Sequence, residues 1–166
     1  MIWFRDFDDI FREMEEEFEE IFNRMMRGIQ SPSEDAKTFG YTIYWDSSLD
    51  KPVVRYFGNV NPKTGELLEE GWRIPYTETS YDKEKNKYVV IAELPGVEKK
   101  DIKVKAGKKH INITAETEER KYKKRIDFDK EIDPKSIKAH FKNGILEIEV
   151  TPIKPPEEEE TEISVD

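Results

Sequence analysis

The feature of the sequence that most constrains the fold is a predicted β-hairpin at residues 139–150. Asn143-Gly144 lies at its centre, and this dipeptide favours a tight turn in which both central residues have positive φ. The strand after the turn alternates aliphatic and acidic side chains, at Leu146, Glu147, Ile148, Glu149 and Val150. Such alternation buries one face of a strand and leaves the other in water. The hairpin therefore predicts a β-domain.

Several other short runs with β character precede this hairpin. They lie at residues 77–81, 88–94, 101–106, 110–115, 121–128 and 136–141. Turn-forming residues separate these runs and no helical pattern interrupts them, which predicts an all-β, immunoglobulin-like antiparallel β-sandwich. Two further runs, at residues 39–45 and 52–57, flank a polar loop and predict a separate β-hairpin. Its aromatic density is typical of cross-strand packing.

Composition limits what else the chain can be. Of its 166 residues, 36% are hydrophobic and 39% are charged, and the net charge is −9. This acidity argues against nucleic acid as a partner, because phosphates attract a basic face. The sequence holds no cysteine, which excludes disulfides and thiolate metal sites. No apolar run approaches the roughly 20 residues of a membrane span, and the start lacks the layout of a signal peptide. We therefore expect a cytoplasmic protein without a membrane partner.

Residues 1–32 are predicted to form an amphipathic helical arm. Its large apolar residues recur three and four positions apart. They are Trp3, Phe4, Phe7, Phe11, Met14, Phe18, Ile21, Phe22 and Met25. The opposite face is acidic, which disfavours binding to anionic lipid. The apolar face can pack on the chain itself or on a second copy, or it can bind non-native client proteins, for which Phe and Met are suited because they repack easily. These roles are compatible if the assembly is dynamic.

Two motifs in the β-region resemble those of a known family. They are Glu93-Leu94-Pro95-Gly96 followed by Asp101-Ile102-Lys103-Val104, and Ala139 followed at the family's spacing by Asn143-Gly144-Ile145-Leu146. Together they resemble the α-crystallin domain of small heat shock proteins over residues 72–150. The hairpin that ends at Phe57-Gly58-Asn59-Val60 is similar to archaeal members. The resemblance implies dimers that assemble into a larger homo-oligomer and hold unfolding proteins without ATP or any other cofactor.

One departure from the family pattern concerns the dimer. Prokaryotic members usually carry a long loop after the strand that corresponds to residues 110–115, and this loop exchanges a strand between partners. Here residues 116–121 are too few for a loop plus an exchanged strand. Either the dimer uses another sheet edge, or the predicted hairpin at residues 38–60 supplies the exchanged strand.

Residues 153–166 are predicted to be a flexible acidic extension, because a segment rich in proline and glutamate cannot bury enough apolar surface to fold alone. Near its end, Ile163 and Val165 stand two positions apart, on one side of an extended strand. They resemble the family's C-terminal I-x-I/V motif, which docks by strand addition in a groove of a neighbouring subunit. The resemblance places that groove between two strands, at Ile102, Val104, Ile137 and Ala139. The alternative is that these four are ordinary core residues.

No catalytic or metal-binding pattern is recognisable in the sequence. The two histidines, His110 and His140, each lie in a predicted strand beside apolar residues, and we expect both to be structural or exposed. Gly107-Lys108-Lys109 is not a phosphate loop, because no serine or threonine follows the lysine. We therefore expect a protein that is not an enzyme.

The chain divides into four predicted parts. They are the helical arm at 1–32, the hairpin and connector at 33–70, the α-crystallin sandwich at 71–152 and the extension at 153–166. The favoured function is that of a chaperone that oligomerises and binds unfolding proteins to prevent their aggregation under heat stress. The alternative is a p23/CS-like co-chaperone or adaptor module, which shares the sandwich but needs neither the heptad arm nor the tail motif.

Overall fold

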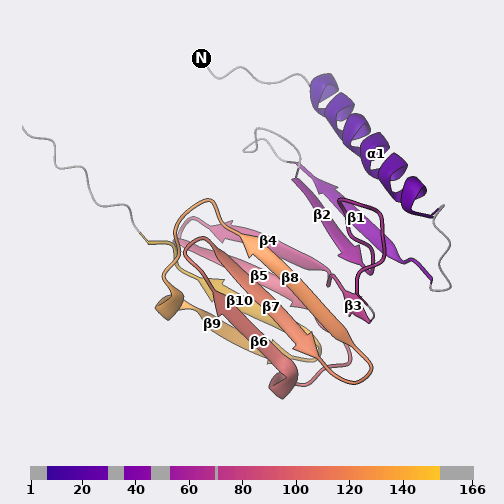
Figure 1. The fold of residues 1–166 in the computed structure, drawn as a ribbon. Coiled ribbons are helices and arrows are strands. Elements are labelled where there is room, and N and C mark those ends of the chain that lie inside the picture. The colour runs from indigo at the N-terminus through magenta and orange to yellow at the C-terminus, as the bar shows by residue number, and fades with distance from the viewer. Residues whose placement is uncertain (1–6, 30–35, 46–52, 70, 154–166) are drawn as a thin grey trace, which may run out of the picture.

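A computed structural model describes residues 7–29, 36–45, 53–69 and 71–153 (Figure 1). The chain begins with α1 (Phe7–Ile29), which is followed by a hairpin of β1 (Phe39–Tyr44) and β2 (Val53–Gly58). The remaining strands build two four-stranded sheets. Figure 1 shows α1 lying along the hairpin, to one side of these two sheets.

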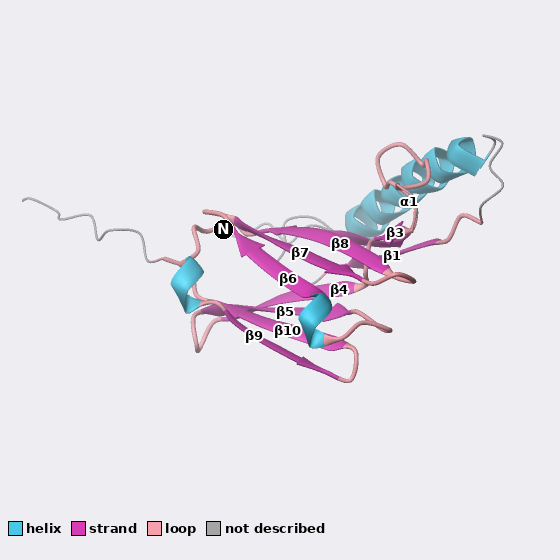
Figure 2. Ribbon diagram, turned by 60° about the horizontal axis from the view of Figure 1, so that its bottom comes forward, coloured by secondary structure: helices cyan, strands magenta, loops and turns pink. Residues whose placement is uncertain are grey.

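The two sheets face each other as the layers of a sandwich (Figure 2). One has the order β4-β5-β10-β9 and consists of β4 (Thr77–Asp82), β5 (Lys87–Glu93), β9 (Lys138–Lys142) and β10 (Ile145–Val150). The other has the order β3-β8-β7-β6 and consists of β3 (Trp72–Arg73), β6 (Ile102–Ala106), β7 (His110–Glu116) and β8 (Lys121–Asp127). Short 3₁₀ helices at Lys99–Asp101 and Pro134–Ser136 precede β6 and β9. The predicted β-sandwich is therefore confirmed.

Alternating side chains of both sheets fill the space between them. Val90 on β5, Ile113 on β7 and Ile148 on β10 are completely buried. Burying an aliphatic side chain of this size contributes about 1.5–3 kcal/mol, so the predicted period-two patterns account for the core.

The two sequence motifs meet in the structure. Asn143 and Gly144 have φ values of 50° and 79°, as the predicted primed turn requires. This turn places Gly144 beside the end of β5, where the Leu94 N–H donates a hydrogen bond of 2.7 Å to the Gly144 carbonyl oxygen. The hairpin and the segment after β5 are therefore joined by their backbones.

A short connection links β7 directly to β8. The Thr117 N–H donates to the Arg120 carbonyl oxygen at 2.8 Å, and the Arg120 N–H donates to Thr117 Oγ1 at 2.9 Å.

The short strand β3 pairs in parallel with the first two residues of β8. The sequence analysis did not predict β3, because two residues are too few to show an alternation.

The hairpin packs against the helix of its own chain. Ile21 and Met25 of α1 form a small second core with Val60, which lies just after β2. Partly buried aromatic residues of the hairpin, Phe39, Tyr41 and Tyr56, surround this core. The Arg24 Nη1 atom adds a hydrogen bond of 2.8 Å to the Pro62 carbonyl oxygen.

Candidate functional site

The predicted tail groove lies where β6 and β9 form neighbouring edges of the two sheets (Figure 2). Ile102 and Val104 of β6 are half-buried and pack on the main core, and so is Ile137, which directly precedes β9. Ala139, in β9, is exposed. All four are at strand edges or beside one, and none is fully buried. The tail residues Ile163 and Val165 lie outside the described residues.

Phe141 also lies on the β9 side of the predicted groove. Phe141 is half-buried and packs on the main core, and it follows Ala139 by two positions, so both side chains share one face of β9. Sequence reasoning missed Phe141 because the family resemblance pointed only to residues 137 and 139. The alternation that begins at Ile137 could have revealed it.

The two strands that border the predicted groove carry basic side chains on their outer faces. Lys103 and Lys105 alternate with Ile102 and Val104 on β6, and Lys138 and Lys142 alternate with Ala139 and Phe141 on β9, so the lysines point away from the predicted groove, and all four are exposed. The predicted tail, in contrast, has four consecutive glutamates at residues 157–160. The outer faces of these strands are therefore opposite in charge to the tail.

The apolar stripe of α1 is split into a covered half and an exposed half. Ile10, Ile21 and Met25 are no more than 3% exposed. The exposed half consists of Phe11, Phe18, Phe22 and Met26, which are 41–54% exposed. Because successive helix residues are about 100° apart around the axis, the hairpin can cover only one side of so wide a stripe.

The predicted arm residues therefore differ in their surroundings. Met14 is half-buried, while the rings of Phe18 and Phe22 stack on each other with their centroids 6.0 Å apart. The Phe18 ring also lies 6.0 Å from the ring of Tyr41 on the hairpin. Trp3, Phe4 and the side chain of Phe7 lie outside the described residues.

Burial beside the helix perturbs one tyrosine of the hairpin. Tyr56 lies among the aromatic residues that cover Ile21 and Met25, and this burial raises its pKa above the ordinary value. Arg24 opposes the shift. Burial as the main cause of this shift is consistent with a packed surface between α1 and the hairpin.

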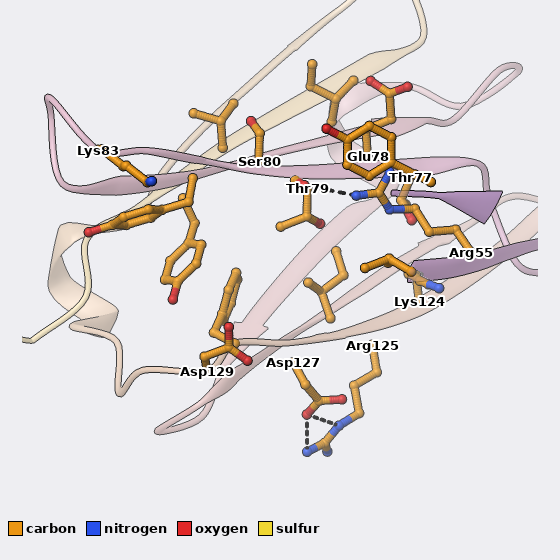
Figure 3. A pocket seen from close by; sticks show the side chains of 18 residues that line it. Arg55, Thr77, Glu78, Thr79, Ser80, Lys83, Lys124, Arg125, Asp127 and Asp129 are labelled. Atoms are coloured by element: carbon orange, nitrogen blue, oxygen red, sulfur yellow. Dashed lines mark hydrogen bonds and ion pairs between the residues drawn. The ribbon is translucent and has the colours of Figure 1, made fainter. Parts of the chain in front are cut away.

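A cleft of about 810 Å³ opens on the other side of the sandwich, between β4 and β8 (Figure 3). Tyr88 and Phe128 are among its lining residues, with ring centroids 4.8 Å apart. Arg55 of the hairpin and Lys124 of β8 lie close together near one end. None of the residues predicted from the sequence as site residues lines this cleft.

The described residues offer no arrangement for metal or membrane chemistry. No group of three or more His, Asp or Glu side chains within them is placed to hold a metal ion. His110 and His140 lie on different sheets, in β7 and β9, and are half-buried and exposed respectively. None of the helices in the described part of the chain has the length and apolar character needed to cross a bilayer.

Comparison with known proteins identifies the class to which this fold belongs. The model of the Hsp20/alpha crystallin family matches residues 80–166. Small heat shock protein C1 of Rickettsia prowazekii (strain Madrid E) is 30% identical over 110 residues, which cover 56% of this chain and 68% of that protein. The chain therefore belongs to the Hsp20/alpha-crystallin family.

Solved structures of small heat shock proteins also resemble the chain. Heat shock protein 16.0 of Schizosaccharomyces pombe matches with a TM-score of 0.47 and 21% identity, over 65% of this chain and 85% of that chain. A small heat-shock protein of Xylella fastidiosa matches with a TM-score of 0.44 and 19% identity, over 55% of this chain and 96% of that chain.

Family membership decides between the two functions that the sequence predicts. The chain has the chaperone role of a small heat shock protein, and the family is one of chaperones rather than enzymes. The expected archaeal subtype is not supported, because the curated relative is bacterial.

Proposed function

We propose that this protein is a homo-oligomeric holdase that binds exposed apolar segments of unfolding proteins through the exposed half of α1. The observation that carries the proposal is the exposure of Phe11, Phe18, Phe22 and Met26 on a helix that is otherwise anchored by buried residues. Exposed apolar area drives association without any cofactor. Holding clients in this way also needs no catalytic step, and we propose that it takes place in the cytoplasm.

We further propose that the tail joins subunits. Ile163 and Val165 would add as a strand at the β6–β9 groove of a neighbouring subunit, with their side chains beside Ile102, Val104 and Phe141. The exposed lysines on the outer faces of β6 and β9 support this assignment through long-range attraction, because the tail that must reach these strands is acidic. The arm and the tail would then be the two assembly elements on either side of the sandwich at residues 71–152.

The holdase proposal is tested by heating a thermolabile protein with and without this chain and following light scattering. We expect suppression of scattering at a near-stoichiometric ratio, with no requirement for ATP. The Phe18→Ser plus Phe22→Ser variant should lose most of this suppression, because both rings lie on the exposed half of α1. Unchanged suppression by this variant would contradict the role of α1.

The tail proposal is tested by size-exclusion chromatography with light scattering. Ile163→Gly plus Val165→Gly should reduce a large particle to a small one. The matched control is Thr161→Gly plus Ser164→Gly, which removes as many side chains from the same tail but leaves the motif intact. If both double variants change the particle equally, the motif does not join subunits.

A further inference from the structure

The cleft between β4 and β8 is bordered by two strand edges. β4 is the outer strand of its sheet. The corresponding edge of β8 is covered by β3 only at Lys121 and Tyr122, so no described strand pairs with it beyond Tyr122. The Thr79 carbonyl oxygen on the edge of β4 faces the cleft and accepts a hydrogen bond of 3.1 Å from Arg55 Nη2, so Arg55 lies at this edge, while no described strand pairs with it. Unpaired edges of this kind can accept an added strand.

Lys124 reaches this cleft from the inner face of β8. It alternates with Tyr122 and Ile126, which are 5% and 7% exposed, and it is itself half-buried. Burial, with a smaller effect from the nearby charge of Arg55, lowers the pKa of Lys124 below its ordinary value. The structure therefore brings two cations together where water access is reduced (Figure 3).

No described carboxylate neutralises Lys124. The part of the chain that the structure covers gives it no hydrogen bond and no ion pair, whereas Asp127 in the same cleft is bound by Arg125 through contacts of 3.0 and 2.9 Å. Glu78 accepts a hydrogen bond of 2.7 Å from the Tyr76 hydroxyl. Charges on edge strands, inward-pointing ones included, hinder pairing with an uncharged segment. An inward, unpaired cation also favours binding of an anion, because a half-buried charge is costly until it is paired.

We propose that the cleft binds an extended acidic segment of a client polypeptide, which adds along the edge of β4 and places one carboxylate between Arg55 and Lys124. Residues two positions apart in an extended segment are about 7 Å apart on one face. An apolar residue two positions from the acidic one would then extend along the cleft toward Tyr88 and Phe128. The recognised pattern therefore has an apolar residue two positions from an acidic one, and a peptide with an apolar residue on each side of the acidic one satisfies it in either strand direction.

The charges of the cleft favour this client over a second copy of the chain. If two copies paired through their β8 edges, Lys123 and Arg125 of each chain would approach like charges of the other, and like charges on paired strands are destabilising. The biological meaning of the site rests on the proposed holdase function, but peptide binding can be measured independently of that function.

The test uses the full-length protein and a fluorescein-labelled peptide, Ser-Val-Ser-Glu-Ser-Val-Ser, whose two valines and glutamate share one face of a strand. Fluorescence anisotropy gives its Kd. Replacing the glutamate by glutamine should weaken binding about tenfold or more, as is typical for the loss of a charge-assisted contact. The isomer Ser-Val-Glu-Ser-Ser-Val-Ser has the same composition but turns its carboxylate to the opposite face, and it should bind as weakly as the glutamine peptide.

Variants of the protein locate the site. Lys124→Met should weaken binding of the glutamate peptide to the level of the glutamine peptide, while leaving the glutamine peptide unaffected. Lys83→Met is the matched control, because Lys83 also lines the cleft but is exposed, and it should change the Kd less than twofold. Equal binding of the three peptides, or equal effects of the two variants, would overturn the proposal.

The peptide comparison on the unmodified protein decides the matter even if Lys124→Met does not fold. The outcome is also separable from that of the holdase test. Suppressed aggregation without carboxylate-dependent peptide binding removes the cleft proposal and leaves the holdase function. Carboxylate-dependent peptide binding without suppression of aggregation would keep the cleft proposal and remove the holdase function.

Discussion

Ile21 and Phe22 are adjacent in α1, but one is buried against the hairpin and the other is exposed to solvent. Ile21 is 1% exposed against the hairpin, while Phe22 is 50% exposed. Ile21→Ala deletes three carbons worth about 0.8 kcal/mol each, and the cavity left behind brings the expected cost to about 3 kcal/mol. Because 1.4 kcal/mol corresponds to a factor of ten, the population with α1 detached from the hairpin should rise roughly 150-fold.

Hydrogen exchange followed by mass spectrometry checks this result directly. Amides of residues 7–29 should exchange much faster in Ile21→Ala, while amides of the buried strands β5, β7 and β10 should be unchanged, because Ile21 belongs to the second core and not to that of the sandwich. Phe22→Ala should cost less than about 1 kcal/mol, in line with exposed sites, and leave exchange of α1 nearly as in the unmodified protein.

The same two variants should separate stability from client binding. Phe22→Ala removes part of the exposed apolar half and should lower the suppression of aggregation. Ile21→Ala leaves that half intact and uncovers more apolar surface, so it should preserve or increase suppression. If Phe22→Ala accelerates exchange of α1 as strongly as Ile21→Ala does, the apolar stripe of α1 is not divided into a covered half and an exposed half.

Three further outcomes follow from the sandwich. Burial lowers the pKa of Lys124 in the folded state. In the pH range between that lowered pKa and the ordinary value of about 10.4, the unfolded chain binds more protons, so the unfolding free energy of the unmodified protein should rise with pH. Lys124→Met should be more stable in urea at pH 7 and lose this advantage by about pH 10.5; a constant difference across this range would contradict the assignment. Gly96→Ala and Gly71→Ala should each lower stability by the roughly 1–2 kcal/mol of a left-handed non-glycine residue, because φ is +81° and +80° at these two positions. An added Cβ at Gly96 would meet only the exposed side chain of Arg120, which can move away, so the two costs should be similar in denaturant titrations; a much larger cost at Gly96 would show that Arg120 is held in place. Ile148→Ala should destabilise the sandwich by about 2–5 kcal/mol in denaturant titrations, and a cost below 1 kcal/mol would place Ile148 outside the core.

Local patterns predict much of this fold. Asn143-Gly144 can adopt positive φ with little strain, and strict alternation in β7 and β10 leaves only one face to bury, so turn and strands could be read from the residues alone. The predicted runs at residues 77–81 and 110–115 each extend by one residue in the structure, to Asp82 and Glu116. Short-range chemistry determines these features, and therefore a short window of sequence contains them.

The surfaces could be predicted only in part. Helical spacing identified the apolar stripe of α1, but which half is covered depends on the hairpin, whose position is a tertiary property. Lys124 belongs to a run of basic residues at 123–125, and such a run is usually solvated. Its inward position and its closeness to Arg55, which precedes it by 69 positions in the sequence, became visible only when the two sheets were assembled.

The four-residue connection between β7 and β8 has a consequence for how the protein forms. Every strand from β3 to β10 finds its partners within its own chain, so the sandwich can be completed before any second copy arrives. The burial of the aromatic residues of the core can be monitored by fluorescence during refolding. Its rate should not depend on protein concentration, whereas the later growth of particles should be second order or higher in protein concentration. Under stress, each newly synthesised chain would be able to fold its sandwich before it binds a second copy.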